Sequence, residues 1–338
     1  MSTARRLVSH RPGHMELERH DIPDEPPPGG ILVKADVTLI SPGTEVANYL
    51  GRTAQRTLTS TEPYHPGYSF AGVVEAVGEG VDAFRPGDRI CGPLPHASWA
   101  VEDRPERLAR MTTIPEGVTS RQAAMTQLAC IALNAVRPAA IQLGDRVAVV
   151  GAGLVGLLAA RFARLDGAHR LAVVELLAPR REAARTTGAD LVADPADPGT
   201  DQRLHAFAPG GFDVVVEATG APSAFVPALE LAARGGRVVL LGSTRGRVEN
   251  FDPYSALHLK GLHVIGAHVS TAPKNATVHD RWTEAANRRV ILELIRDGVL
   301  EVDSLITDVV PPDQGGEAFR ALAEEPAGHL GVVIDWSA

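Results

Sequence analysis

The sequence predicts an α/β protein of two domains, in which a β-rich domain precedes a doubly wound parallel sheet. Three observations support this prediction. The chain has 338 residues, more than one hydrophobic core usually spans. Its first third holds short, strand-like runs separated by closely spaced glycine and proline turns. Beyond a Pro-Glu-Gly break at 115–117, strand-like and helix-like segments alternate, which is typical of βαβ units covered on both faces.

The first third is expected to fold as a compact, irregular barrel. A break rich in proline and glycine at 26–30 precedes an alternating run of branched residues at 31–40, which predicts a strand. Shorter strands are expected at 71–77, 89–91 and 98–101.

The following part opens with a helix. Thr119 and Gln122 have the spacing of a capping box, and the helix is expected to continue through Leu128. Alternating segments then predict strands at 146–150, 171–175, 212–217, 237–241 and 262–266, and helices at 154–165 and 180–187.

Composition excludes several classes of protein. A formal net charge of −8 argues against a nucleic-acid partner, and the paired arginines at 180–181 and 288–289 are explained as solvated helix faces. No run approaches the roughly 20 apolar residues of a membrane helix, and the N-terminal residues do not resemble a signal peptide, so a cytoplasmic protein is expected. Only two cysteines are present, Cys91 and Cys130, which excludes a disulfide framework and a cysteine-rich zinc site.

A glycine-rich turn predicts a dinucleotide site. The expected strand at 146–150 leads into Gly151-Ala152-Gly153-Leu154-Val155-Gly156, and a helix begins at once. The first glycine permits the tight turn, the second lets the backbone approach a pyrophosphate, and the third lets the helix pack closely. The phosphates then lie at the positive end of the helix. The backbone of Leu154 and Val155 belongs to this site.

An acidic residue is expected at the end of the next strand, where it can accept hydrogen bonds from ribose hydroxyls. Glu175 follows Gly156 by 19 residues and fits this place. A carboxylate there repels a 2′-phosphate, so NAD is favoured over NADP, although the nearby Arg180 softens this preference. Two turns after later strands are expected to flank the nicotinamide; they contribute Ala218, Thr219, Gly242 and Ser243.

At this point the chain resembles the medium-chain dehydrogenase/reductase superfamily over almost its whole length. The matching segments are 41–45 (SPGTE), 66–74 (PGYSFAGVV), 77–81 (VGEGV), 86–89 (PGDR) and the glycine turn, with a closing helix near 317–322. The resemblance implies a GroES-like catalytic domain at 1–128, completed by 269–338, and a Rossmann NAD-binding domain at 129–268. It also implies a small-molecule substrate, an active site between the domains, and a homodimer or homotetramer.

The chain departs from the zinc-using members of this superfamily. Pro42 stands where they carry a cysteine ligand, and Tyr68 stands where they carry a histidine ligand, with Ser69 as its neighbour in place of an acid. Gln127 occupies the region of the third ligand, and a neutral amide binds zinc poorly. No zinc is therefore expected. The pairing of a Ser-x-Gly-Thr-Glu motif with Pro-Gly-Tyr resembles the branch around bacteriochlorophyllide a dehydrogenase.

Without a metal, hydroxyl groups are expected to move the proton. Tyr68 is the candidate donor, Thr44 matches the hydroxyl that relays protons in zinc members, and Glu45, Ser69 and Asn48 are candidates to complete the relay. Alternatives stay open: Tyr68 can simply fill the space of a lost ligand, and Glu45 can be a structural carboxylate. His65 and His96 lie near these motifs, where loop or hydrogen-bonding roles are the usual ones.

Three functions follow from this sequence. The leading hypothesis is a zinc-independent NAD(H)-dependent oxidoreductase that interconverts a secondary alcohol and a ketone on a small polar substrate. The second is an NADPH-dependent enoyl or quinone reductase. The third is a non-catalytic protein that binds the dinucleotide for structure or sensing.

Overall fold

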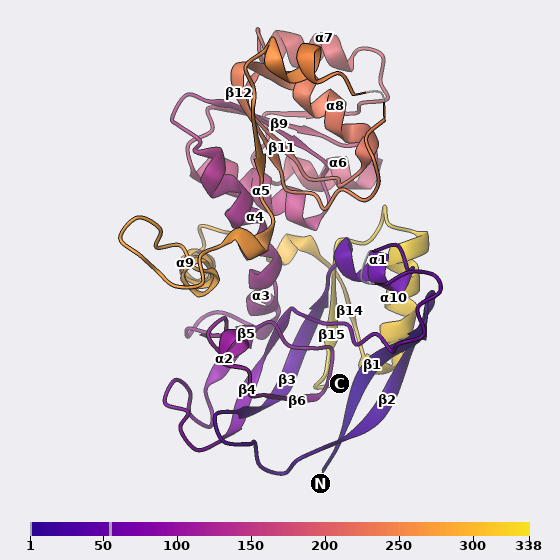
Figure 1. The fold of residues 1–338 in the computed structure, drawn as a ribbon, viewed down its shortest axis with the longest axis vertical. Coiled ribbons are helices and arrows are strands. Elements are labelled where there is room, and N and C mark those ends of the chain that lie inside the picture. Colours follow the sequence, from indigo (N-terminus) through magenta and orange to yellow (C-terminus); the bar gives the residue numbers. More distant parts are fainter. Residues whose placement is uncertain (1, 54–55, 250) are drawn as a thin grey trace. The chain divides into compact units, whose positions relative to one another are not determined.

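The structure, a computed structural model, describes residues 2–53, 56–249 and 251–338, and the chain forms two compact units (Figure 1). The β-rich unit contains Met1–Gln127 and Lys274–Ala338, and the parallel-sheet unit contains Leu128–Pro273. The sequence predicts divisions after residues 128 and 268, whereas the compact units divide after Gln127 and Pro273. The second unit is therefore inserted into the first. No helix in the described part of the chain is long and apolar enough to cross a membrane.

The parallel-sheet unit holds six strands in the order β10-β9-β8-β11-β12-β13. Every neighbouring pair in this sheet is parallel. In chain order the sheet reads 3-2-1-4-5-6, which is the arrangement of doubly wound dinucleotide-binding folds. The strands are β8 (Arg146–Val150), β9 (Arg170–Val174), β10 (Leu191–Ala193), β11 (Phe212–Glu217), β12 (Ala232–Leu240) and β13 (His263–Gly266).

Helices surround the sheet in Figure 1, and all but the first of them connect two of its strands. They are α4 (Thr126–Ala139), α5 (Leu154–Leu165), α6 (Ala178–Arg185), α7 (Thr200–Phe207) and α8 (Pro222–Leu231). The strands are apolar on both faces because both are covered; Val147, Ala148 and Val149 are all completely buried. This unit confirms the predicted Rossmann architecture, and β8, α5 and β11 have the bounds that the sequence predicts.

The β-rich unit contains a seven-stranded sheet in the order β14-β15-β3-β4-β5-β7, with β6 paired to β3, and a separate hairpin of β1 and β2. Its strands are β1 (Ser2–Arg11), β2 (His14–Ile22), β3 (Ile31–Ile40), β4 (Phe70–Val77), β5 (Arg89–Gly92), β6 (Trp99–Glu102), β7 (Thr112–Thr113), β14 (Ile306–Val310) and β15 (Gly331–Asp335). Its helices are α1 (Thr44–Tyr49), α2 (Pro105–Leu108), α3 (Ser120–Ala124), α9 (Glu284–Arg296) and α10 (Gly315–Glu324).

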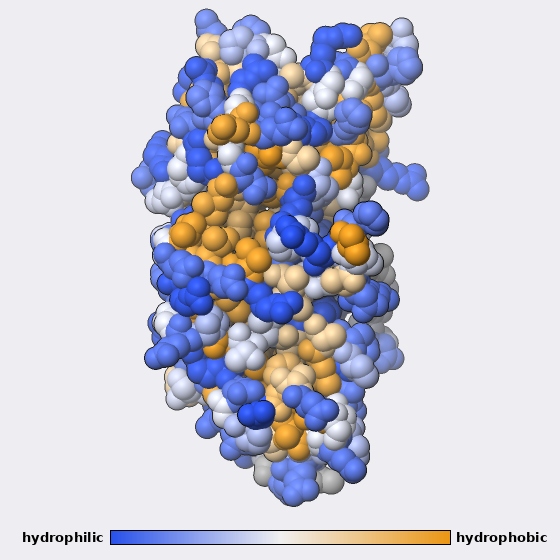
Figure 2. All heavy atoms as spheres, turned by 90° about the vertical axis from the view of Figure 1, so that its left-hand side faces the viewer, coloured by the Kyte–Doolittle hydropathy of each residue, from blue (hydrophilic) through white to orange (hydrophobic). Residues whose placement is uncertain are grey.

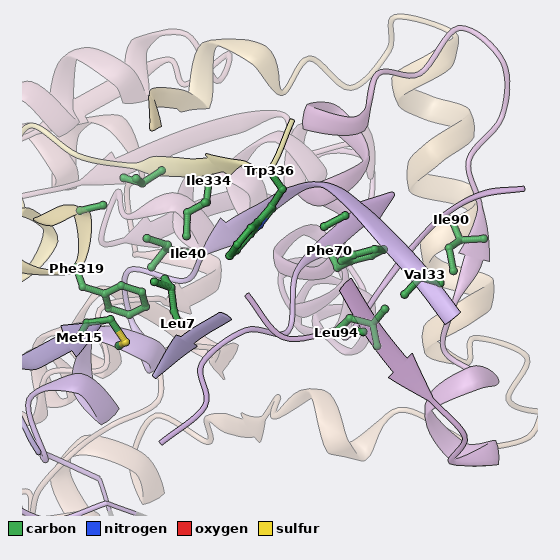
Figure 3. Packing of buried hydrophobic residues seen from close by; sticks show 14 of the residues in the cluster. Leu7, Met15, Val33, Ile40, Phe70, Ile90, Leu94, Phe319, Ile334 and Trp336 are labelled. Atoms are coloured by element: carbon green, nitrogen blue, oxygen red, sulfur yellow. The ribbon is translucent and has the colours of Figure 1, made fainter. Parts of the chain in front are cut away.

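The core of the β-rich unit joins both ends of the chain. Figure 3 shows Leu7 of β1 and Phe319 of α10 close together, with Ile334 of β15 nearby. Phe319 and Ile334 are completely buried. Burial of such side chains contributes on the order of 1.5–3 kcal/mol each, so residues after 274 are a large part of what stabilises this unit.

One expected helix is divided in two. The capping box at Thr119 and Gln122 forms as predicted, but α3 ends at Ala124 and α4 begins at Thr126. The Thr126 hydroxyl donates a hydrogen bond to the carbonyl of Ala123 at 2.7 Å.

On the face drawn in Figure 2, polar side chains surround several groups of apolar ones.

Candidate active site

The glycine turn of the parallel-sheet unit has the geometry that a pyrophosphate requires. Gly151 has a φ of +96°, and a Cβ there would lie 2.7 Å from Cγ2 of Thr219. A Cβ at Gly156 would lie 2.0 Å from the carbonyl oxygen of Gly151, so only glycine lets α5 start this close to β8. At Gly153 the nearest atom to a Cβ is Nη1 of Arg180 at 3.8 Å, which leaves room above the turn. The three glycines fit the three expected roles.

Glu175 is attached to this turn. It is 7% exposed, and its Oε2 accepts a hydrogen bond from the backbone N–H of Ala152 at 2.6 Å. Its Oε1 accepts from the backbone N–H of Leu177 at 2.8 Å. The carboxylate therefore holds the glycine turn against the end of β9, in addition to the ribose contact expected from the sequence.

Arg180, on α6, lies beside Glu175 and the turn. Burial lowers the pKa of the Arg180 guanidinium, and the nearby carboxylate of Glu175 offsets only part of this effect. The two side chains place opposite charges next to the glycine turn, and Arg180 is half-buried rather than part of a solvated helix face.

A second polar turn follows β11 at the same edge of the sheet. Glu217 is 1% exposed, and its Oε1 accepts hydrogen bonds from the backbone N–H groups of Thr219 and Gly220 at 2.7 and 3.2 Å. A Cβ at Gly242 would lie 2.2 Å from the backbone nitrogen of Gly220. The exposed side chains of Thr219 and Ser243 therefore come from turns that touch each other and the glycine turn.

In the β-rich unit, a buried carboxylate joins the two motif loops. Glu45, on α1, is completely buried. Its Oε2 accepts a hydrogen bond from the backbone N–H of Ser41 at 2.7 Å, and its Oε1 accepts from that of Gly67 at 2.5 Å. This geometry favours the interpretation of Glu45 as a structural carboxylate, which fixes the backbone on which Tyr68 is mounted.

Tyr64 lies near this carboxylate and also interacts with Tyr68. Tyr68 is half-buried, and it interacts electrostatically with Tyr64. Burial raises the pKa of Tyr64, and the charge of Glu45 raises it further. Asn48, a predicted relay member, has its amide nitrogen 3.5 Å from the Tyr64 hydroxyl and accepts a hydrogen bond from Thr53. Sequence reasoning missed Tyr64, because nothing in its neighbourhood repeats a known motif.

His96 lies against the same carboxylate from a third segment. It is 1% exposed, and its Nε2 is 3.3 Å from Oε1 of Glu45. Neither ring nitrogen has a hydrogen-bond partner of good geometry among the described residues. The segments are tightly joined, because a Cβ at Gly67, whose φ is +116°, would lie 2.1 Å from the backbone nitrogen of His96. The sequence could not show that His96 and Glu45 meet, since they are far apart along the chain.

Two further candidates differ in access. Thr44 is exposed at the first position of α1, where its hydroxyl can meet a ligand. Ser69 is completely buried, and its Oγ has no hydrogen-bond partner within the described ranges. This placement does not support direct participation of Ser69 in a reaction.

Gln127 belongs to a buried ionic network. Its Oε1 accepts a hydrogen bond from Nη2 of Arg288 at 2.5 Å. The same guanidinium group lies 3.0 Å from Oε1 of Glu284, which also pairs with Arg110 at 2.8 Å. Arg288 is completely buried, so its interpretation as part of a solvated helix face is wrong. The error has a physical reason, because the guanidinium of Arg288 donates hydrogen bonds to Gln127, Glu284 and the Arg110 carbonyl. Gln127 and Arg110 are distant in sequence, so this compensation of the buried charge is not visible in the local pattern.

These residues do not fit a catalytic zinc ion. Pro42 has no donor atom, and the oxygen of Gln127 already accepts from a cation. Outside positions 1, 54–55 and 250, no group of three or more His, Cys, Asp or Glu side chains lies close enough to hold a metal. Zinc needs three such ligands and an open position.

Comparisons with known proteins agree with this fold. A family model described as alcohol dehydrogenase GroES-like domain matches residues 28–135, and one described as zinc-binding dehydrogenase matches residues 155–288. The chain is 27% identical to a probable D-xylulose reductase A of Aspergillus terreus, over 90% of this chain and 91% of the relative.

Solved structures are similar over nearly the whole chain. An oxidoreductase/dehydrogenase of unknown specificity from Escherichia coli is 20% identical with a TM-score of 0.85, covering 99% of both chains. A putative zinc-binding dehydrogenase from Sinorhizobium meliloti is 24% identical with a TM-score of 0.81, covering 99% of this chain and 100% of that one.

The chain belongs to the medium-chain dehydrogenase/reductase superfamily. Its β-rich unit is GroES-like, and its parallel-sheet unit is the Rossmann domain of that fold. It is an NAD(P)-dependent oxidoreductase of the medium-chain type.

Proposed function

We propose that this chain is a zinc-independent, NAD(H)-dependent oxidoreductase that interconverts a secondary alcohol and a ketone on a small polar substrate. One observation carries the proposal. At the three places where zinc-using relatives supply ligands, the chain has a proline, a tyrosine, and a glutamine whose oxygen accepts from the buried Arg288. The pairing of the 41–45 motif with Pro66-Gly67-Tyr68 also supports membership in the branch that resembles bacteriochlorophyllide a dehydrogenase.

The glycine turn and Glu175 would hold the dinucleotide. When bound, nicotinamide supplies the hydride chemistry, and the protein supplies orientation and a route for the proton. Glu175 keeps a negative charge at the end of β9, which disfavours the 2′-phosphate of NADP and supports NAD.

Tyr68 is the proposed proton donor, and Thr44 is the proposed relay hydroxyl. Glu45 acts as a positioning residue, because its carboxylate fixes the backbone of Gly67 immediately before Tyr68. His96 beside Glu45 adds a second polar group behind the loop. A general acid of this kind contributes roughly 10²–10⁴-fold to the rate.

Metal analysis of the purified protein tests the zinc-independent mechanism. We expect less than about 0.1 zinc per chain and unchanged turnover of NADH with small ketones after treatment with a chelator, because no ligand set is present. One zinc per chain that is needed for turnover would overturn the proposal.

Substitution of Tyr68 tests the proton donor. Tyr68→Phe should lower kcat by roughly 10²-fold or more while the Kd for NADH is unchanged. Tyr49→Phe is the matched control, since its hydroxyl donates a hydrogen bond to the Gly13 carbonyl at 2.7 Å and is not part of the proposed relay. Equal kcat in wild type and Tyr68→Phe would remove Tyr68 from the mechanism.

Arg180 favours a second candidate, an NADPH-dependent enoyl or quinone reductase. Its Nη1 lies near the glycine turn, 3.8 Å from where a Cβ of Gly153 would be, and can meet a 2′-phosphate. The Sinorhizobium meliloti relative was solved bound to NADP. Parallel titrations with NADH and NADPH decide between the two: a preference for NADPH of about tenfold or more, with reduction of activated double bonds, would favour this candidate.

A further inference from the structure

A basic pocket lies in the β-rich unit, on the side of the β1–β2 hairpin. Its volume is about 360 Å³, and its lining joins the hairpin, β3, β6 and the end of β15. These elements lie together in the lower part of Figure 1. We define this basic pocket by three cationic residues, Arg5, Arg19 and Lys34, and two aromatic ones, Trp99 and Trp336. None of these residues belongs to the proposed oxidoreductase site.

The three cations lie close enough to repel one another. Arg5 and Arg19 are directly opposite each other across the antiparallel hairpin. Like charges in this position destabilise a strand pair, so the hairpin carries an unfavourable contact that a neutral pair would avoid. Lys34 adds a third positive charge from β3, and its Nζ lies 5.7 Å from the centroid of the Trp99 ring.

No acidic side chain neutralises this group. Among the described residues, none of the three cations is within ion-pair distance of a carboxylate. Asp21 lies on the same strand face as Arg19, opposite the pocket residue Thr3, and it forms no ion pair with the three cations among the described residues. Asp36, two positions after Lys34, accepts a hydrogen bond from the Ser120 hydroxyl at 2.7 Å. The chain as a whole has a formal charge of −8, yet this one pocket is lined by three cations that have no ion-pair partner among the described residues.

The floor of the pocket is rigid. Trp336 is only 6% exposed, and its indole N–H donates to the Thr38 hydroxyl at 2.9 Å. Figure 3 places it beside Ile334 at the edge of the core. The backbone of Arg5 is fixed as well, since its N–H donates to the Ser98 hydroxyl at 2.9 Å. A partly apolar floor held by hydrogen bonds, with cationic side chains around it, can select a compact anion.

We propose that the basic pocket binds a small anion carrying two or more phosphate or carboxylate groups. Two guanidinium groups form bidentate hydrogen bonds with either kind of group, and Lys34 supplies a third charge. The volume is at the lower end of small-ligand sites, so the anion is the size of pyrophosphate or citrate rather than a dinucleotide.

Titration of the full chain with inorganic pyrophosphate and, separately, with citrate tests the pocket at constant ionic strength. Two of the three tryptophans line the pocket, so intrinsic fluorescence reports binding, with calorimetry as a second measurement. We expect a Kd below about 1 mM for at least one anion at low salt, and weaker binding as salt increases. The two arms distinguish phosphate from carboxylate ligands. Lack of saturation by either anion at about 10 mM would overturn the proposal.

The variants separate a built site from general electrostatic attraction. Arg19→Gln should weaken binding about tenfold or more, yet its Tm should equal or exceed that of wild type because the cross-strand repulsion is relieved. Lys34→Gln should also weaken binding. Arg11→Gln is the matched control, since Arg11 is exposed on the same hairpin and outside the pocket. An equal loss of affinity in Arg11→Gln and Arg19→Gln would show that no specific site exists.

Discussion

At the scale of single residues, Gly67 shows how a backbone contact organises the motif loops. Its φ is +116°, and a Cβ at this position would lie 2.1 Å from the backbone nitrogen of His96. There is therefore no room for any side chain at position 67. The Glu45 carboxylate then accepts from its N–H. The Tyr68 loop is therefore determined by three segments that the sequence separates widely.

Gly67→Ala should destabilise the protein by about 2–4 kcal/mol, because a methyl group would collide with backbone atoms that cannot move independently. Thermal or urea unfolding measures this loss. Gly80→Ala is the control: Gly80 also has a positive φ, of +82°, but a Cβ there meets no atom within 4 Å. It should cost only about 1–2 kcal/mol of backbone strain. Equal losses in the two variants would contradict the close contact at Gly67.

Glu284 shows how a buried charge is compensated. Burial alone would raise the pKa of its carboxyl, but Arg288 and Arg110 together hold that pKa below the ordinary value. The ionised carboxylate in turn compensates the completely buried Arg288. A depressed pKa in the folded state means that this stabilisation is present in full above the unfolded value, near about 4.3, and is lost as the pH falls through the folded value.

Glu284→Gln should destabilise the protein at pH 7 by about 3–5 kcal/mol, because Arg288 would keep its charge without a counter-charge. The difference from wild type should begin to shrink as the pH falls below about 4.3, where the carboxyl of the unfolded chain takes up its proton, and should be smallest once the folded carboxyl is protonated as well. Urea unfolding at several pH values measures both effects. Glu317→Gln, at an exposed pair with Arg320, should behave as wild type at every pH. A difference for Glu284→Gln that stays constant down to pH 3 would exclude this linkage.

At the scale of elements, the passage from β8 into the first turn of α5 includes two glycines, Gly153 and Gly156, whose roles can be separated by experiment. Gly156 is needed for packing, since a Cβ would lie 2.0 Å from the Gly151 carbonyl. Gly153 has open space above it. One position therefore serves the fold and the other serves the ligand.

Gly156→Ala should lower both stability and NADH affinity, the latter by about tenfold or more, because α5 must move away from β8. Gly153→Ala should weaken NADH binding to a similar extent while Tm is nearly unchanged, since the methyl group occupies space that the pyrophosphate needs. NADH fluorescence titration and thermal unfolding measure the two properties. Full NADH affinity in Gly153→Ala would place the pyrophosphate elsewhere.

The same elements show what the sequence could predict. β8, α5 and β3 have the predicted bounds, because local signals such as glycine turns and branched runs determine them. The β1–β2 hairpin, α9 and β15 were not predicted as elements. Charged residues interrupt the apolar pattern of the hairpin, and β15 is a short run of five residues whose two partners, β3 and β14, the sequence does not reveal. The glycine turn of the candidate site was predictable from local pattern, whereas His96, Tyr64 and Arg288 depend on contacts between distant segments.

At the scale of the whole molecule, two separate cores predict two responses to a ligand. The parallel-sheet unit holds the candidate dinucleotide site, and the β-rich unit has its own core. A ligand stabilises the unit that binds it by about 2.7 kcal/mol at 100 times its Kd.

Calorimetric unfolding with and without NADH should therefore shift the part of the transition that belongs to the parallel-sheet unit by several degrees. Hydrogen exchange of β8 and β11 identifies which unit responds. The Gly153→Ala variant should show no shift at the same NADH concentration. Protection confined to β3 and β4 would show that the dinucleotide binds the β-rich unit and would contradict this prediction.

The central position of β15 has a consequence for biosynthesis. Residues 331–335 lie between β14 and β3, so the β-rich unit lacks an interior strand until these residues leave the ribosome. The inserted unit, at 128–273, is complete well before that. Emergence order therefore favours folding of the middle of the chain first, while the N-terminal 127 residues wait with an open sheet edge next to β3. During that interval β3 is the strand most exposed to wrong pairing, and it is the one that a holding chaperone would need to protect.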